Sequence, residues 1–91
     1  MPETRPYWVY IVRCNDDTLY TGICRDLKAR IHTHNTSPKG AKYTRSRRPV
    51  KLVYSMFLDN KSQALREEAR IKSLTRAAKL SLISQTHATS S

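Results

Sequence analysis

Three segments of the chain carry apolar patterns typical of β-strands. Residues 7–14 (Tyr-Trp-Val-Tyr-Ile-Val-Arg-Cys) are mostly β-branched or aromatic at both odd and even positions, which indicates a strand covered on both faces and therefore central in its sheet. Residues 18–24 predict a second strand, joined to the first through the turn residues 15–17 (Asn-Asp-Asp). Residues 51–58 (Lys-Leu-Val-Tyr-Ser-Met-Phe-Leu) predict the third strand.

Helical patterns separate the hairpin from the third strand and follow that strand. A first helix is expected over residues 26–35, with Asp26 at its N-cap. A second is expected over about residues 62–74, and a third follows Thr75, which is placed to cap it. The element order β-β-α-β-α-α predicts an α+β fold class, with a small three-stranded sheet and helices packed against it.

The length of 91 residues allows one hydrophobic core, so we expect a single domain over residues 1–85 and a polar, disordered tail over residues 86–91. The sequence contains no run of 18 apolar residues and no apolar segment near its N-terminus, so neither a membrane span nor a signal peptide is expected. Two cysteines are too few for a disulfide scaffold. A cytoplasmic location is therefore the expectation.

The hairpin places two tyrosines on one face of the sheet if its loop consists of the three residues 15–17. Tyr10 then lies opposite Gly22 and Tyr20 opposite Val12, and the two tyrosines are diagonal neighbours ~7–8 Å apart. A two-residue loop would break this relation. Gly22 would leave space beside Tyr10 for a phosphate to approach. The two tyrosines are candidates for a functional site or for a packing contact.

Two helical segments offer polar residues that could complete such a site. Arg30 and His34 are four residues apart and share a helix face, which either looks across the tyrosine-bearing face of the sheet or is solvated surface. On a helical wheel, Glu68 falls within the least polar stripe of the second helix, where a carboxylate must be paired or bind a cation. That stripe is defined by Ala64, Leu65, Ile71 and Thr75. Glu68 is therefore either a structural partner of Lys72 or a metal ligand. Glu67 is expected to face solvent and to be dispensable.

The charge distribution points to a polyanionic partner. The chain has 17 Lys and Arg against seven Asp and Glu, a net charge of +10, and residues 25–51 hold nine of those basic residues against one Asp. A concentrated positive field of this kind favours nucleic acid. An anionic membrane surface is the rival partner, but the basic segment lacks the apolar face of an interfacial helix. A solvated basic surface is the third alternative.

The order and spacing of these residues resemble those of the GIY-YIG nuclease superfamily. The spacing Tyr-x9-Tyr-x-Gly-x7-Arg-x3-His runs from Tyr10 to His34, and Glu68 follows on the later helix. Residues 40–45, 49–54 and 64–72 look like the small, stand-alone YhbQ-like branch. The resemblance implies a three-stranded antiparallel sheet flanked by helices and a metal-dependent hydrolysis of DNA phosphodiester bonds.

The resemblance also implies a role for each matching residue. Tyr10 would activate or orient the attacking water, and Tyr20 would sit at the scissile phosphate. Arg30 would stabilise the charge of the phosphorane, and His34 would contact phosphate or transfer a proton. Glu68 would hold one divalent ion, Mg²⁺ or Mn²⁺. Tyrosine has an ordinary pKa near ~10, so Arg30, the metal or a lysine would have to lower it for Tyr10 to act as a base.

Basic side chains would bind the phosphates with little sequence selectivity. The resemblance implies structured DNA as the substrate, in preference to RNA, and a protein partner is expected to help with targeting. The candidates are Lys39, Lys42, Arg45, Arg47, Arg48, Lys51 and Lys72. Ile23 stands where several active relatives have lysine, which favours the alternative of a non-catalytic nucleic-acid-binding module. A protein-interaction domain with a basic face is the third hypothesis.

Overall fold

The computed structural model describes residues 6–36 and 46–89, with side chains described as far as residue 85. The three strands form one antiparallel sheet in the order β2-β1-β3, so the central position expected for the first strand is confirmed. Together with the three helices of the described residues they give the α+β class and the order β-β-α-β-α-α that the sequence predicts. The elements are β1 (Tyr7–Arg13), β2 (Leu19–Cys24), α1 (Leu27–Thr36), β3 (Lys51–Leu58), α3 (Lys61–Lys72) and α4 (Arg76–Thr89).

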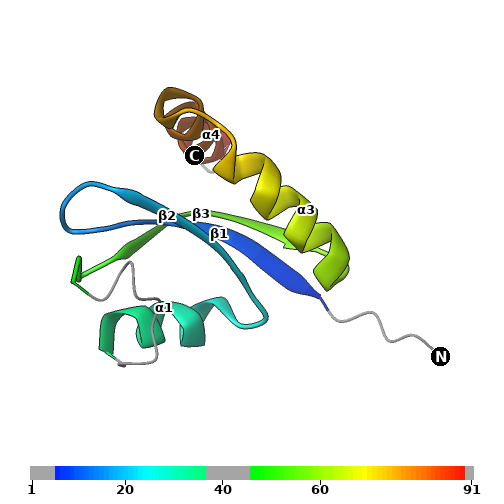
Figure 1. Cartoon of the computed structure of the whole chain (residues 1–91), viewed down its shortest axis with the longest axis horizontal. Coiled ribbons are helices and arrows are strands. Elements are labelled where there is room, and N and C mark those ends of the chain that lie inside the picture. Colours follow the sequence, from blue (N-terminus) through cyan, green and yellow to red (C-terminus); the bar gives the residue numbers. More distant parts are fainter. Residues whose placement is uncertain (1–5, 37–45, 90–91) are drawn as a thin grey trace.

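Helices cover both faces of the sheet, with α1 on one side and α3 and α4 on the other (Figure 1). Successive side chains of a strand point to opposite faces. Val9 and Ile11 of β1 accordingly belong to the core beneath α3 and α4, whereas Tyr10 and Val12 belong to the core beneath α1. All four are at most 1% exposed. This double coverage explains why β1 is apolar at odd and even positions alike.

The loop of the hairpin consists of residues 15–17, as the expected register requires. The amide of Cys14 donates to the carbonyl of Thr18 over 2.8 Å, and Asp17 has a φ of 69°, the left-handed conformation typical of the last residue in three-residue hairpin loops. Tyr10 is paired with Gly22, and Val12 is paired with Tyr20. The diagonal relation of the two tyrosines is therefore confirmed.

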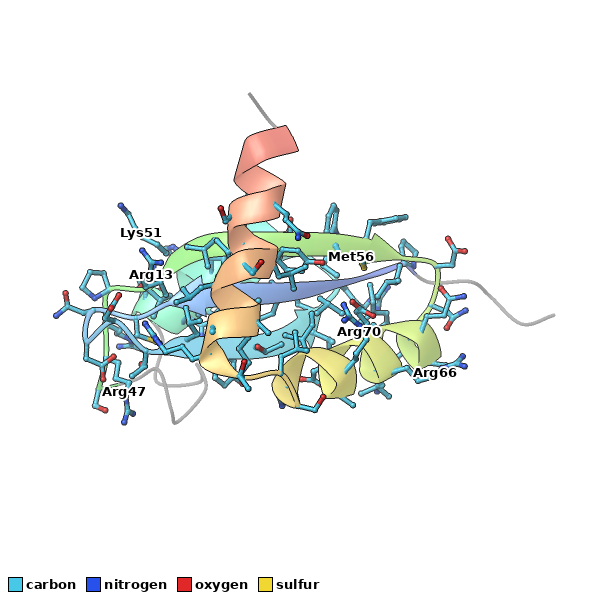
Figure 2. The ribbon with its side chains drawn as sticks, turned by 90° about the horizontal axis from the view of Figure 1, so that it is seen from above. Arg13, Arg47, Lys51, Met56, Arg66 and Arg70 are labelled. Carbon is cyan, nitrogen blue, oxygen red and sulfur yellow. The ribbon has the colours of Figure 1, made fainter. Side chains whose placement is uncertain are left out.

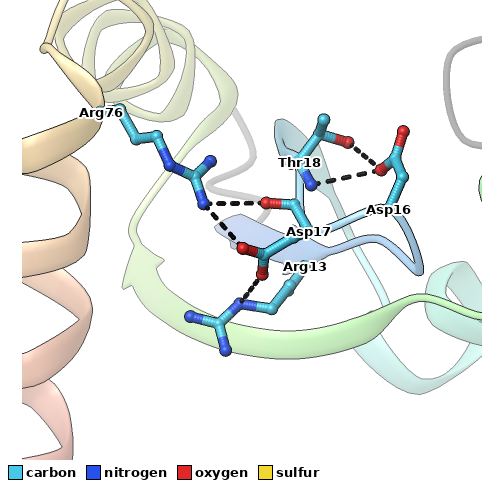
Figure 3. A network of polar contacts seen from close by, with 5 residues as sticks. All are labelled: Arg13, Asp16, Asp17, Thr18 and Arg76. Atoms are coloured by element: carbon cyan, nitrogen blue, oxygen red, sulfur yellow. Dashed lines mark hydrogen bonds and ion pairs between the residues drawn. The ribbon is translucent and has the colours of Figure 1, made fainter.

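Asp17 also attaches the hairpin to α4 (Figure 3). Its carboxylate pairs with Arg13 at 3.5 Å and with Arg76 at 3.3 Å, and its carbonyl accepts a hydrogen bond from Arg76 Nη2 over 2.9 Å. Exposed ion pairs of this kind contribute at most about 1 kcal/mol each. Their effect is to hold the first turn of α4 against the turn that sets the register of β1 and β2.

The later helices begin at side-chain caps. Asn60 Oδ1 accepts from the amide of Gln63 over 2.9 Å at the start of α3, and Thr75 Oγ1 accepts from the amide of Ala78 over 3.1 Å at the start of α4. The backbone of α4 is helical as far as Thr89, past the boundary at residue 85 where the polar tail was expected to start. The segment contains neither glycine nor proline, so no residue in it interrupts the helix. None of the helices within residues 6–36 and 46–89 is long and apolar enough to cross a membrane.

Candidate functional site

Gly22 makes room for the ring of Tyr10. A Cβ atom built at Gly22 would lie 2.6 Å from the Tyr10 hydroxyl oxygen and 2.8 Å from Cζ, closer than any real side chain tolerates. The space that the sequence suggested for an approaching phosphate is therefore taken by Tyr10 itself. The reason is the pairing of these two residues on adjacent strands, which lets the large side chain lean across its small neighbour.

The hydroxyl of Tyr10 contacts both candidate residues of α1. It lies 2.8 Å from Nε2 of His34, and it accepts a hydrogen bond from Nε of Arg30 over 3.4 Å. Asp26 Oδ1 caps the helix by accepting from the amide of Ala29, and the helical period then brings Arg30 and His34 onto the face that looks at the sheet. His34 is 0% exposed, so the alternative of a solvated pair is wrong for this histidine.

Tyr20 completes a group of three aromatic rings. Its ring centroid is 6.5 Å from that of Tyr10 and 5.5 Å from that of His34, with the tyrosine and histidine planes inclined by 68°. Tyr10 and His34 are themselves 5.8 Å apart, centroid to centroid. Tyr20 is half-buried, whereas the other two are buried. We call Tyr10, Tyr20, Arg30 and His34 the four-residue cluster. Of the five catalytic candidates, these four come together.

Burial keeps the two innermost members of the cluster uncharged at neutral pH. Desolvation raises the pKa of Tyr10 to about 12, although the hydrogen bond and the positive charge of Arg30 act in the opposite direction. Desolvation also lowers the pKa of His34 to about 4, helped by the charges of Arg30 and Arg48. A neutral Tyr10 can donate its proton to His34 Nε2 while accepting from Arg30. Direct base catalysis by Tyr10 would require a lowered pKa, whereas burial raises the pKa of this residue.

Glu68 lies on α3, on the layer opposite α1 (Figure 1). Its carboxylate pairs with Nζ of Lys72 at 3.2 Å, which is the structural partner that the sequence offered as an alternative to a metal. The neighbouring Glu67 is paired in the same way, through Arg70 at 3.0 Å and 2.5 Å. That pairing, through the Arg70 hydrogen bonds first of all, keeps the pKa of the Glu67 carboxyl below its usual range.

The expectation that Glu67 faces solvent is wrong. The side chain of Glu67 is 17% exposed and that of Glu68 is 18% exposed, so the two are equally covered. The helical wheel had placed Leu65 inside the apolar stripe, but Leu65 is 45% exposed. The buried stripe is instead centred on Ala64 and Ile71, both 0% exposed, and the two glutamates flank it on either side.

At Glu68 a divalent ion would be bound by one protein carboxylate and not by a complete set of protein ligands. Within the described part of the chain, no three His, Cys, Asp or Glu residues are grouped so as to hold a metal. Mg²⁺ commonly keeps several water molecules and binds through one or two carboxylates together with substrate phosphates. Glu68 fits that mode of binding, provided that the ion competes with Lys72 for the carboxylate.

The candidate phosphate-binding residues differ in how far they are already engaged. Arg47 Nε pairs with Asp16 at 2.9 Å, Arg48 Nε donates to the carbonyl of His34 over 2.5 Å, and Lys72 pairs with Glu68. Lys51 is exposed and lies with Arg13 and Arg47 at the hairpin end of the sheet (Figure 2). Lys39, Lys42 and Arg45 lie outside the described residues.

Arg48 and Asn35 hold the end of α1, and the sequence patterns gave no sign of either role. Asn35 accepts from the amide of Val50 over 2.7 Å and donates to its carbonyl over 3.2 Å, which ties the end of α1 to the residue before β3. Arg48 binds the carbonyl of His34 as described above. These contacts join segments 14 and 15 residues apart, beyond the reach of helical or strand periodicity. Both residues help to position His34 beneath the sheet.

Comparisons with known proteins extend over nearly the whole chain. The sequence matches the family described as the GIY-YIG catalytic domain over residues 6–81. It is 54% identical over 80 residues to a UPF0213 protein of Streptococcus agalactiae, covering 88% of this chain and 90% of that one. It is 51% identical over 79 residues to a UPF0213 protein of Staphylococcus saprophyticus, covering 87% of this chain and 95% of that one.

Two solution NMR structures share the fold. The UPF0213 protein BH0048 from Bacillus halodurans has a TM-score of 0.58 and 42% sequence identity, covering 88% of this chain and 84% of that chain. The protein EF2693 from E. faecalis has a TM-score of 0.62 and 34% identity, covering 96% of this chain and 92% of that chain. The first of these structures carries the same UPF0213 designation as the relatives found by sequence.

Proposed function

Because this chain belongs to the GIY-YIG family, for which a nuclease-type function is the common activity, we propose that it hydrolyses DNA phosphodiester bonds with the help of a divalent cation. The observation that supports the proposal is the four-residue cluster, in which the Tyr10 hydroxyl lies between Arg30 Nε and His34 Nε2. Two tyrosines of the sheet, together with the arginine and histidine of α1, supply the hydrogen-bond donors and the proton acceptor that phosphodiester hydrolysis needs.

Tyr20 and Arg30 are the members of the cluster that we assign to the substrate. Both are half-buried, so both retain surface that a phosphate can reach. The guanidinium of Arg30 has five N–H donors, one of which bonds Tyr10, and its other donors suit the oxygens on which charge develops. A phosphate held here would lie over the β2 edge of the sheet, because β2 carries Tyr20 and is an edge strand.

Tyr10 and His34 suit a proton relay behind the substrate. Tyr10 is 1% exposed and its pKa is raised, so it is poorly suited to act alone as a base. In the relay, the attacking water gives a proton to the Tyr10 oxygen as the Tyr10 proton moves to Nε2 of His34, over the 2.8 Å contact. Arg30 stabilises the oxygen of Tyr10 throughout, since its Nε already donates to it.

Glu68 is the residue that we assign to the cation. α3 packs over β2, the edge strand that carries Tyr20, as well as over β1, on the face of the sheet opposite α1 (Figure 1). A bound divalent ion would supply positive charge at the phosphate oxygens.

We also propose a cytoplasmic location, where DNA is available as a substrate. A reducing cytoplasm would keep Cys14 and Cys24 as the free thiols that they are in this structure. A protein partner would direct the domain to its substrate.

The test is cleavage of labelled duplex, single-stranded, flapped and four-way DNA in Mg²⁺, Mn²⁺ or EDTA. Glu68→Gln should abolish cleavage while leaving DNA binding intact. Glu67→Gln is the matched control, because it is the adjacent residue on the same helix, equally covered and equally ion-paired. Cleavage that is metal-dependent, structure-selective and lost only in Glu68→Gln would support the proposal. Equal activity of both variants would contradict the role of Glu68.

A non-catalytic nucleic-acid-binding module is the second candidate function. The burial and raised pKa of Tyr10 favour it, as does the occupation of the Glu68 carboxylate by Lys72. For such a module we expect binding that weakens steeply with salt, no cleavage in any metal, and identical binding by the two glutamate variants.

A further inference from the structure

The half-buried Trp8 and the exposed Phe57 form an aromatic pair on the sheet. The two residues are directly opposite each other on β1 and β3, and their rings meet edge to face with centroids 5.1 Å apart and planes inclined by 68°. Phe57 is 53% exposed, more than Leu52, Met56 or Leu65. Within the described part of the chain, neither ring belongs to the residues that pack in or against the two cores. The pair therefore has no packing role that accounts for it.

The aromatic pair lies on the same face of the sheet as the four-residue cluster. Trp8 precedes Tyr10 by two positions on β1, so both side chains project toward the α1 side, ~7 Å apart along the strand. Phe57 and Ser55 repeat that relation on β3, where they are paired with Trp8 and Tyr10. The irregularity in this pairing falls later, between Ile11 and Val12 of β1, so the alternation is unbroken here.

Basic residues stand at the same end of the sheet. Trp8 is paired with Cys24 on β2, and Cys24 is followed directly by Arg25. Arg25, just before α1, and Lys28, in its first turn, are both exposed. Aromatic rings beside a positively charged surface are the combination that proteins use to bind single-stranded nucleic acid, since every base offers a π-face for stacking and every phosphate a negative charge.

We propose that Trp8 and Phe57 bind an unpaired nucleobase of the strand whose phosphate lies at Tyr20 and Arg30. The inference rests on the proposed function and narrows its substrate to nucleic acid with an unpaired nucleotide beside the scissile bond, such as a flap or a gap. A base within a continuous duplex is stacked on its neighbours and does not present its face to the protein. The net charge of +10 makes a nucleic acid strand the fitting occupant of this surface.

The chain reports directly on such stacking, because Trp8 is its one tryptophan. The experiment titrates the full chain with an oligothymidine strand and with a blunt duplex of the same length, in EDTA so that no cleavage occurs. Trp8 fluorescence and the anisotropy of a labelled oligonucleotide are both recorded. We expect saturable quenching by the single strand and at least fivefold weaker binding of the duplex, in keeping with the typical contribution of one stacked base.

Two matched variants on β3 test whether the Trp8–Phe57 pair, which we call the platform, binds a base. Phe57→Leu removes an exposed ring, and Met56→Leu changes its 37% exposed neighbour, which points to the other face. Met56 is seen from the α3 and α4 side in Figure 2. Phe57→Leu should weaken single-strand binding at least fivefold, whereas Met56→Leu should leave it unchanged. Trp8→Phe, which keeps a ring, should retain binding in the anisotropy measurement and shows that the pair acts through its π-faces.

The outcomes separate this inference from the proposed nuclease activity. Quenching and a Phe57→Leu defect without cleavage in any metal would uphold the platform and overturn the nuclease. Cleavage with equal binding by Phe57→Leu and wild type would uphold the nuclease and overturn the platform. Binding without any change in Trp8 fluorescence would also overturn it. So would a concentration-dependent dimer in sedimentation that Phe57→Leu abolishes, because the occupant would then be a second copy of the chain.

Discussion

The hydroxyl of Tyr10 lies 2.8 Å from Nε2 of His34, a residue 24 positions further along the chain and 0% exposed. This hydrogen bond joins the central strand of the sheet to α1. It also joins two candidate catalytic residues inside the core beneath that helix. Stability and the proposed chemistry therefore depend on the same pair of side chains.

Removing the hydroxyl should cost stability. Tyr10→Phe keeps the ring but deletes the hydrogen bonds to His34 and Arg30. We expect the free energy of unfolding to fall by about 1–3 kcal/mol, the usual cost of removing one partner of a buried hydrogen bond. Urea denaturation measures it, and an unchanged m-value would show that the unfolding reaction is otherwise the same. A variant as stable as wild type would contradict the buried contact.

Stability should depend on pH through His34. Its pKa is lowered to about 4 in the folded state by burial, against about 6.5 in an unfolded chain, so the unfolded state binds the proton more readily. The stability that neutral His34 contributes is therefore fully present above pH ~6.5 and is lost as the pH falls toward ~4, by about 3 kcal/mol in all.

Thermal melts between pH 4 and pH 8 provide the measurement. His34→Asn should flatten the profile in this window, because the titrating group is gone. His32→Asn is the matched control, since His32 is an exposed residue of the same helix and should leave the slope as in wild type. A wild-type profile that is flat from pH 4 to pH 6.5 would refute the assigned pKa.

A methyl group at position 22 should disturb the packing of Tyr10. Gly22→Ala places Cβ at 2.6–2.8 Å from the Tyr10 hydroxyl and Cζ, and the buried ring has little freedom to move. We expect a loss of about 1–3 kcal/mol in chemical denaturation, as for other overpacked sites. Tyr10→Leu should cost less in the Gly22→Ala background than in wild type, because the shorter side chain relieves the clash, and a double-mutant cycle quantifies the coupling. Strictly additive effects would argue against the contact.

Two basic residues three positions apart in the sequence should behave differently toward DNA. Lys51→Gln removes an exposed charge, so we expect weaker binding and a salt dependence reduced by about one phosphate contact, with no change in melting temperature. Arg48→Gln removes the donor to the His34 carbonyl, so we expect a lower melting temperature as well. Binding isotherms at several salt concentrations and thermal melts test both. Identical stability of the two variants would contradict the structural role of Arg48.

Strand patterns and turn composition predicted most of this fold. The residues 15–17 set the hairpin register by themselves, because the length of a hairpin loop fixes which residues pair. From that register alone, the closeness of Tyr10 and Tyr20 followed. The apolar character of β1 on both faces likewise predicted its central position, since only a strand with helices on both sides buries every side chain.

Helix docking was the part that the sequence could not determine. A helical wheel gives the angles between the residues of α3, but the sheet against which the helix packs decides which residues face inward. Because the predicted apolar stripe included Leu65, its centre was displaced from Ala64 and Ile71, which are the buried residues. The helical pattern also left open whether His34 faces the sheet or the solvent. The burial of this histidine depends on Asn35 and Arg48, which hold the end of α1 through contacts between separate segments.

The two cores that share β1 bear on how activity would be lost during evolution. Tyr10, Gly22 and His34 fit together as parts of the core beneath α1, so selection for folding alone would preserve them in a relative that no longer cleaves DNA. Glu68 belongs to neither core and pairs with an exposed lysine, so it has no such protection. Decay of the enzyme should accordingly leave the motifs of the sheet intact and first appear as replacements on α3.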